Sequence, residues 1–153
     1  MRIVTWRGDT NFTLDNVPKP CLTDNVGNGA QTFATITPSL PQKWSTPASN
    51  ESVLVKIDTV GVCGTDVHIT QGLFPSAPPK VLGHEGSGII VEVGKLIDPS
   101  RIGERVALNT TSHCGICNAC RTWSFSRCER AEATSGMFAE YACLLYTSDA
   151  ADE

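Results

Sequence analysis

Four cysteines lie within the run CGICNACRTWSFSRC, with the spacing C-x2-C-x2-C-x7-C. Four thiolates complete a tetrahedral zinc site and leave no position for a substrate. The run therefore predicts a closed, structural zinc site, whose ligands are Cys114, Cys117, Cys120 and Cys128. The alternatives are four ordinary cysteines, or a zinc ribbon, which pairs two CxxC or Cys/His knuckles across about 12 to 20 residues. Three cysteines at x2 intervals argue against the ribbon.

A second set of metal-ligating side chains comes from the stretches VGVCGTDVH and VLGHEGSG. Cys63 follows an apolar run and precedes a predicted helix, whose N-terminus favours a thiolate. His84 and Glu85 are flanked by glycines, which let the backbone bend tightly and bring the imidazole close to a metal. Taken singly, Cys63 is as readily a core cysteine as a metal ligand. His84 by itself is more often a surface or packing residue than a ligand. Together they indicate a second metal site with an open position.

Both sets of ligands need a framework, and the surrounding sequence predicts strands. Residues 2–7 and 11–17 are β-prone and flank Gly8-Asp9, which predicts a hairpin. The runs ESVLVKIDTVGVC, SGIIVEVG and RVALNT predict three further strands bounded by glycines and polar residues. The stretch GTDVHITQG predicts a short helix capped by Thr65 or Asp66.

Between these elements, residues 21–50 are rich in Pro, Ser, Thr, Asn and Gly and show no sustained periodicity. We interpret this stretch as a long loop or an insertion. The only GxG, in GHEGSG, precedes a predicted strand rather than joining a strand to a helix, so it is not a dinucleotide-binding fingerprint. The predicted fold class is mainly β, a partly open barrel with glycine-rich corners and short helices.

Composition excludes several classes of protein. The chain has 153 residues, 41% of them hydrophobic and 18% charged, which fits one globular domain. No stretch has the roughly 20 apolar residues of a membrane span, the start is not a secretory signal, and no basic stripe indicates nucleic-acid binding. Seven cysteines without a signal peptide point to metal ligands in a reducing compartment, so we expect the cytoplasm.

Five motifs, GVCGTDVH, GHEGSGIIVEVG, IGERV, the four-cysteine run and FAEY, occur in the order seen in zinc-dependent medium-chain alcohol and polyol dehydrogenases. The chain resembles that family over about residues 1–142. The resemblance implies the GroES-like catalytic domain, a partly open β-barrel with a four-cysteine zinc lobe. It also implies that Cys63 and His84 bind a catalytic zinc, that Glu85 is a conditional ligand or contacts a ligand, and that the four-cysteine run binds a structural zinc.

The same resemblance implies roles in catalysis. A zinc with an open position lowers the pKa of a bound alcohol. Thr65 matches the hydroxyl that accepts the alcohol's proton, and His68 matches the residue that passes this proton to solvent. Asp66 matches a carboxylate that orients a zinc ligand. The alternatives are helix caps for Thr65 and Asp66, and a solvated surface histidine for His68.

The implied reaction is hydride transfer from a small alcohol or polyol to NAD or NADP, in a full-length enzyme that is a homo-oligomer. Gly64 and GTDVH look closer to polyol and threonine dehydrogenases than to ethanol enzymes. The family's remaining zinc ligand and its Rossmann domain are not in this sequence, so we expect an incomplete catalytic domain that is inactive by itself. The alternatives are a non-catalytic zinc-binding scaffold and a nucleic-acid zinc module.

Three departures from the family pattern concern the four-cysteine run, the long stretch before the ESVLVK strand and the end of the chain. Trp123 stands where the family usually has glycine, and residues 21–50 exceed the usual short link. Residues 143–153, CLLYTSDAADE, match the translation of a transposase-type sequencing adapter, so we expect a non-native tail there. The alternative is a native strand followed by an acidic tail. Cys143 is accordingly not expected to be a metal ligand.

Overall fold

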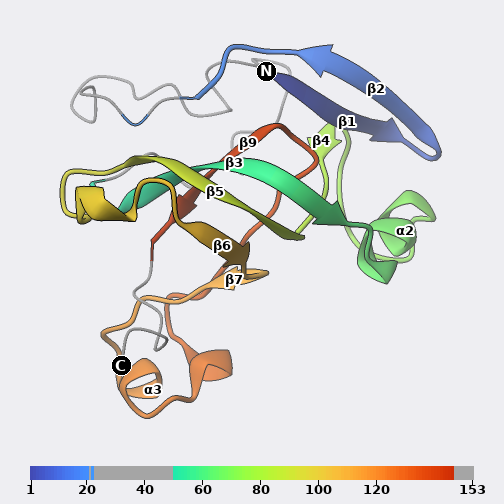
Figure 1. Cartoon of the computed structure of the whole chain (residues 1–153). Coiled ribbons are helices and arrows are strands. Elements are labelled where there is room, and N and C mark those ends of the chain that lie inside the picture. The colour runs from blue at the N-terminus through green and yellow to red at the C-terminus, as the bar shows by residue number, and fades with distance from the viewer. Residues whose placement is uncertain (21, 23–49, 147–153) are drawn as a thin grey trace.

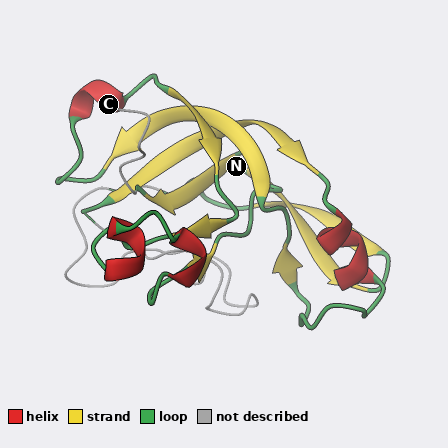
Figure 2. Cartoon of the chain, turned by 90° about the horizontal axis from the view of Figure 1, so that it is seen from below, coloured by secondary structure: helices red, strands yellow, loops and turns green. Residues whose placement is uncertain are grey.

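A computed structural model describes residues 1–20, 22 and 50–146 of the chain, and in them strands predominate. The described strands form a three-stranded sheet, a second sheet of four strands and a two-stranded sheet. The strands curve around a common interior, and the short helical segments lie at their periphery (Figure 2). The predicted mainly β architecture is confirmed. The stretch predicted as a loop or insertion falls outside the described residues except at its margins.

The opening hairpin is formed by β1 (Arg2–Gly8) and β2 (Asn11–Asn16). Its turn contains two residues with positive φ, Gly8 at 115° and Asp9 at 47°, as a tight hairpin turn requires. The predicted hairpin is therefore confirmed. A short strand that the sequence did not indicate, β4 (Lys80–Val81), pairs antiparallel with β1.

The second sheet has β3 (Ser52–Gly61) between β5 (Glu85–Val93) and β9 (Tyr141–Leu145), with β6 (Arg105–Leu108) at the far edge. The three strands expected from the β-branched runs are present. Gly88 sits where a Cβ atom would lie 2.2 Å from the carbonyl oxygen of Lys56, so this point of the β3–β5 pair has room only for glycine. In β9, Cys143 pairs with Leu54.

The segment 137–140 joins the first two sheets. On one side, the N–H of Val4 donates to the carbonyl of Phe138, and the N–H of Glu140 donates to that of Arg2. On the other, the N–H of Ile57 donates to the carbonyl of Glu140. The buried apolar side chains form separate clusters, and Phe138 of this segment packs against two of them. One of these contains Ile3 and Val81, and the other contains Trp6, Ile69 and Leu82. A third cluster, with Val53, Val55 and Ile90, lies in the second sheet.

Helix α2 (Gly64–Thr70) follows β3 directly and lies at its end (Figure 1). Its N-cap residue is Cys63, so the prediction that Thr65 or Asp66 caps this helix is wrong. The chain becomes helical immediately after Cys63, because the Asp66 carboxylate accepts the Cys63 N–H at 3.0 Å and closes the first turn. Thr65 and Asp66 are thus the second and third helical residues.

The four-cysteine segment forms a lobe at the far end of the molecule from the opening hairpin (Figure 1). Its elements are β7 (Thr111–Ser112), α3 (Asn118–Arg121), the 3-10 turn η2 (Phe125–Arg127) and β8 (Glu132–Ala133). The other 3-10 turn, η1 (Pro99–Arg101), follows β5. No helix in the described ranges is long and apolar enough to cross a membrane.

Candidate metal centres

The lobe brings the four predicted sulfur ligands to one point. The sulfurs of Cys114, Cys117, Cys120 and Cys128 all lie within 4.8 Å of one another. The sulfur–sulfur distances are 3.5 Å between Cys117 and Cys120, 3.6 Å between Cys114 and Cys128, and 4.0 Å between Cys114 and Cys120. None of the four points out of the cluster.

Backbone N–H groups surround these sulfurs and set their electrostatics. The N–H groups of Cys114 and Arg130 each donate to the Cys128 sulfur at 3.4 Å, and they lower the pKa of that thiol. Hydrogen bonds from the N–H groups of Cys120 and Glu129 lower the pKa of Cys117 to about 6. Burial raises the pKa of Cys120 to about 12, and its contacts with the neighbouring thiols add to this effect.

This donor set fits zinc. Four thiolates suit a tetrahedral soft-ligand site, and the N–H···S bonds would offset their negative charge. Four protein sulfurs fill a tetrahedral site, so no position remains for a substrate. The lobe's arrangement suits a structural metal.

Trp123 in this lobe has a φ of 58°, in the left-handed region that favours glycine. The side chain is 65% exposed and meets the Phe125 ring edge-on, with the centroids 5.7 Å apart. The tryptophan side chain is largely exposed, and the four sulfurs of the cluster still converge beside it.

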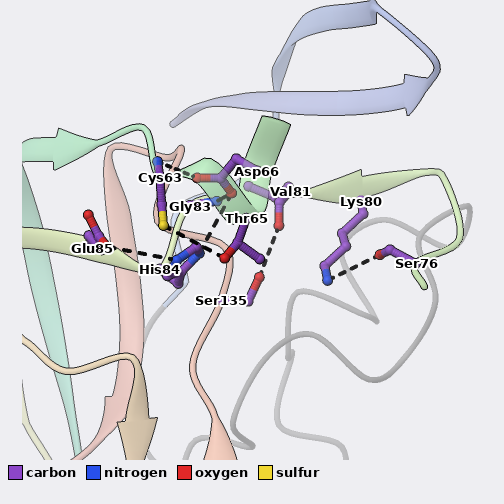
Figure 3. A network of polar contacts seen from close by, with 10 residues as sticks. All are labelled: Cys63, Thr65, Asp66, Ser76, Lys80, Val81, Gly83, His84, Glu85 and Ser135. Carbon is purple, nitrogen blue, oxygen red and sulfur yellow. Dashed lines mark hydrogen bonds and ion pairs between the residues drawn. The ribbon is translucent and has the colours of Figure 1, made fainter. Parts of the chain in front are cut away.

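The second group of ligands comes from two parts of the barrel. Cys63 lies between the end of β3 and the start of α2. His84 and Glu85 lie where β5 begins. Their ligand atoms lie within 4.8 Å of one another, and the His84 Nε2 atom is 4.0 Å from Glu85 Oε1 (Figure 3). The Glu85 side chain is 51% exposed whereas that of His84 is 18% exposed, so the group opens to solvent on its carboxylate side.

Asp66 lies behind this group and is 4% exposed. Its carboxylate accepts the N–H groups of Cys63 at 3.0 Å and Gly83 at 3.2 Å. The same carboxylate lies 3.6 Å from Nδ1 of His84, which turns Nε2 toward Cys63 and Glu85 (Figure 3). Asp66 therefore holds both chain segments that carry the ligands.

Thr65 and His68, the two other predicted site residues on α2, differ in their placement. The Thr65 hydroxyl lies 3.7 Å from the Cys63 sulfur and faces the ligand group (Figure 3). The His68 side chain is exposed, one helical turn further on. No hydrogen bond or ion pair within the described residues joins the His68 ring to the ligand group.

Two glycines lie beside the group: Gly83, whose tight bend the sequence predicted, and Gly61, whose position the sequence did not reveal. Gly83 has a φ of 88°, and a Cβ there would lie 2.5 Å from the Phe138 ring. Gly61 faces Glu85 across the β3–β5 pair, and a Cβ there would lie 3.1 Å from a Glu85 carboxylate oxygen. The cross-strand register that places Gly61 opposite Glu85 is not visible in a single sequence.

Lys80 is a further residue that the sequence did not single out. It is 8% exposed in β4, with its amine 3.4 Å from the Ser76 hydroxyl (Figure 3). Burial lowers the pKa of Lys80 to about 8, and the negative charge of Asp66 opposes that shift. Lys80 thus adds positive potential on the side of Asp66 away from the ligands.

Comparison with known proteins gives a match over residues 49–149 to the Alcohol dehydrogenase GroES-like domain. Sorbitol dehydrogenase from Halalkalibacterium halodurans is 39% identical over 101 residues, which cover 63% of this chain and 29% of that protein. L-threonine 3-dehydrogenase from Caldanaerobacter subterraneus subsp. tengcongensis is 38% identical over 99 residues, which cover 60% of this chain and 28% of that protein.

Among solved structures, the alcohol dehydrogenase RspB from Escherichia coli CFT073, complexed with cofactor NADH, superposes with a TM-score of 0.64 at 25% identity. The match covers 95% of this chain and 36% of that chain. This chain therefore spans less than a third of the curated relatives and little more than a third of that structure.

Proposed function

Because the chain belongs to the alcohol dehydrogenase GroES-like domain family, we propose that it is the zinc-binding catalytic domain of an NAD(P)-dependent alcohol or polyol dehydrogenase. In this proposal Cys63, His84 and Glu85 hold the catalytic zinc, and the four-cysteine lobe holds a structural zinc. The reaction converts an alcohol to a ketone or an aldehyde by hydride transfer.

One observation carries the proposal. Cys63, His84 and Glu85 converge within 4.8 Å, and a hydroxyl, that of Thr65, lies 3.7 Å from the Cys63 sulfur. A thiolate, an imidazole and a carboxylate suit zinc, and the group is open to solvent on its Glu85 side, which gives a substrate oxygen access to the metal. The donor set therefore fits the metal, and the nearness of the hydroxyl to the Cys63 sulfur supports the proposed role of Thr65 with the substrate proton.

Bound there, zinc supplies a Lewis acid that lowers the pKa of an alcohol. The chain's own residues supply the rest. Asp66 fixes the His84 ring through Nδ1 and ties α2 to Gly83, so the sulfur and the imidazole stay in position before substrate enters. Glu85, the most exposed of the three, is the ligand best able to move as substrate enters or leaves.

Thr65 is assigned the role of accepting the proton of the substrate hydroxyl on its Oγ1 atom. His68, exposed on the same helix, is proposed to pass that proton to solvent. The route between the two needs water, because the structure gives them no direct contact among the described residues. A hydride leaves the adjacent carbon at the same time, so proton and hydride together complete a two-electron oxidation.

The hydride acceptor is proposed to be NAD or NADP, bound by a part of the protein outside this sequence. The NADH-bound relative in the fold comparison supports a nicotinamide cofactor. The GxG of Gly86 and Gly88 lies inside β5, where it packs against β3 and offers no strand-to-helix phosphate turn. We infer that the chain alone does not turn over substrate.

The substrate class is a small alcohol with further polar groups, which the names of the sorbitol and threonine relatives support. Nucleic acid and membrane are not proposed as partners. We place the protein in the cytoplasm, because the six described cysteines are free thiols arranged as metal ligands or buried singly. The full-length enzyme is proposed to be a homo-oligomer.

The proposal is tested by loading the chain with cobalt(II), a spectroscopic substitute for zinc, and counting metal ions per chain. Two ions are expected, and a chelator should remove one of them first. Cys63→Ser and His84→Ala should each abolish the labile ion and leave the lobe's ion in place. Addition of sorbitol or L-threonine should change the visible spectrum of the labile ion only.

The alternative function, a non-catalytic zinc-binding scaffold, makes a different prediction. In that case the chain binds one ion, in the lobe, and Cys63→Ser leaves metal content and spectrum unchanged. A single ion that is insensitive to His84→Ala would overturn the proposed catalytic site. Retention of two ions with no response to any polar alcohol would overturn the substrate class alone.

A further inference from the structure

The four sulfurs of the lobe are not evenly arranged. The 3.5 Å contact joins Cys117 to Cys120, and the 3.6 Å contact joins Cys114 to Cys128. These two contacts have no sulfur in common, so together they divide the cluster into two pairs. The Cys114–Cys120 contact, which would mix the pairs, is longer at 4.0 Å.

Backbone structure supports the same division. Cys117 is the N-cap of α3 and Cys120 lies in its first turn, so their side chains are neighbours on one helical face. The N–H of Cys114 donates to the Cys128 sulfur at 3.4 Å, which closes the two ends of the lobe onto each other. Each pair is therefore brought together by backbone contacts within the lobe itself.

We propose that the metal-free lobe is a site of oxidation by hydroperoxides, which convert it to two defined disulfides, Cys117–Cys120 and Cys114–Cys128. A disulfide has an S–S distance of about 2.05 Å, so each pair closes by about 1.5 Å through rotation of its side chains. The inference concerns the lobe and does not rest on the proposed dehydrogenase function.

The chemistry balances within each pair. One sulfur attacks a peroxide oxygen and becomes a sulfenic acid, and the first water leaves. The partner sulfur then attacks the sulfenic sulfur, forms the S–S bond and releases the second water. Two thiols thus supply the two electrons and two protons that one hydrogen peroxide consumes.

Accessibility also favours the lobe over the other described cysteines. Cys114, Cys117 and Cys128 are half-buried, so one sulfur of each pair can meet a small peroxide. Cys63 has the Thr65 hydroxyl rather than a thiol beside its sulfur, and Cys143 lies in the sheet paired with Leu54. Neither belongs to a group of converging thiols.

The test uses the full chain, stripped of metal with a chelator, then treated with hydrogen peroxide, alkylated and digested with trypsin. Trypsin separates residues 106–121, which carry three of the lobe cysteines, from residues 128–130, which carry Cys128. In the unmutated chain the two peptides should be disulfide-linked, with four of the seven thiols lost to alkylation. A chain loaded with zinc should keep those four thiols.

Two variants decide the pairing. In Cys114→Ser, the peptide 106–121 should contain an internal disulfide and residues 128–130 should be released alkylated. In Cys117→Ser, the two peptides should remain linked through Cys114, and Cys120 should be alkylated. Cross-linking of Cys128 in the first variant, or of Cys120 in the second, would overturn the proposed pairing. Sulfinic acids without disulfides in the unmutated chain would overturn the site itself.

Discussion

The two metal centres use cysteine in different ways. In the lobe, all four ligands come from residues 114–128, and the turns between them carry the N–H groups that contact the sulfurs. In the barrel, the ligands come from the end of β3 and the start of β5, and a buried carboxylate joins the two segments. The lobe is a local structure, whereas the barrel centre requires the whole β framework.

This difference in construction has a chemical consequence. A local loop can enclose a metal completely, which stabilises the fold but excludes substrate. Ligands from two strand ends can leave one side open, because the framework rather than the metal holds them in place. We therefore expect the lobe to depend on its metal for rigidity, and the barrel centre to depend on its framework for metal affinity.

The largest expected effect comes from removing a lobe ligand. Cys120→Ser should lower the lobe's zinc affinity at least about a thousandfold, a loss of about 4 kcal/mol from the roughly 10–16 kcal/mol that structural zinc provides. The lobe should then become sensitive to trypsin at Arg121 and Arg127. Zinc content and limited proteolysis measure both effects.

Cys143→Ser is the matched control for this variant, because burial also raises the pKa of Cys143, to about 11, in a strand outside both metal centres. Its metal content should stay unchanged. Equal metal loss in the two variants would show that the lobe's metal depends on the barrel, contrary to the comparison.

The next largest effect concerns glycines with positive φ in the two regions. Gly83→Ala should destabilise the chain by about 3 kcal/mol, because it combines left-handed strain with overlap on Phe138. Gly115, in the lobe, has a φ of 70°, and a Cβ atom added there would meet no described atom within 4 Å, so Gly115→Ala should cost only about 1 kcal/mol. Urea unfolding of the metal-loaded chain gives both values, and equal losses would contradict a framework-dependent barrel centre.

An intermediate effect is expected at the carboxylate behind the barrel centre. Asp66→Asn should weaken cobalt binding there by about 10- to 100-fold, because an amide cannot accept two N–H groups and also hold the imidazole as a charged carboxylate does. The lobe's affinity should not change. Asp98→Asn, at the exposed cap of η1, is the control and should alter neither site; unchanged cobalt affinity in Asp66→Asn would remove Asp66 from its positioning role.

The smallest effect is expected at Trp123. Trp123→Gly relieves left-handed backbone strain of about 1–2 kcal/mol. It also loses the contact with the Phe125 ring, which contributes about 0.5–1.5 kcal/mol. In addition, the greater freedom of glycine stabilises the unfolded chain by about 0.4–1 kcal/mol. These terms nearly offset one another, so thermal unfolding should show a change of less than about 1 kcal/mol. A loss above about 2 kcal/mol would mean that the tryptophan is part of the lobe's core.

The lobe could be predicted from the sequence because its ligands are local: the x2 spacings alone place the sulfurs on adjacent turns. The barrel centre was harder to predict, because Cys63 and His84 lie far apart in the sequence. Their glycine-rich surroundings indicated an open metal site, and the family resemblance then gave the ligands their roles. The pairing of Gly61 with Glu85 and the reach of Asp66 to Gly83 depend on strand register, which no short motif encodes. The helix cap was misplaced because Thr65 and Asp66 are both good cap residues, whereas the actual cap, Cys63, is not.

The last strand raises a separate question of origin. In β9, Cys143 and Leu144 pair with Leu54 and Val53 of β3. Such pairs can form between β-prone residues of any origin. The non-native origin of residues 143–153 stays a proposal. Resequencing the source locus with a different library chemistry tests it: the same eleven codons followed by a stop would refute it, and an open frame continuing into a βαβ region would support it.

The segment 137–140 has a consequence for the order in which the protein folds. Arg2 and Glu140 hydrogen-bond and pair across 138 residues of sequence. During translation at about 5–20 residues per second, β1 therefore waits on the order of ten seconds for the residues that join it to the second sheet. Long-range pairing of this kind slows folding. A nascent chain arrested before residue 137 should leave the opening hairpin open to protease, while the lobe, with its four sulfurs already synthesised, is able to take up its metal.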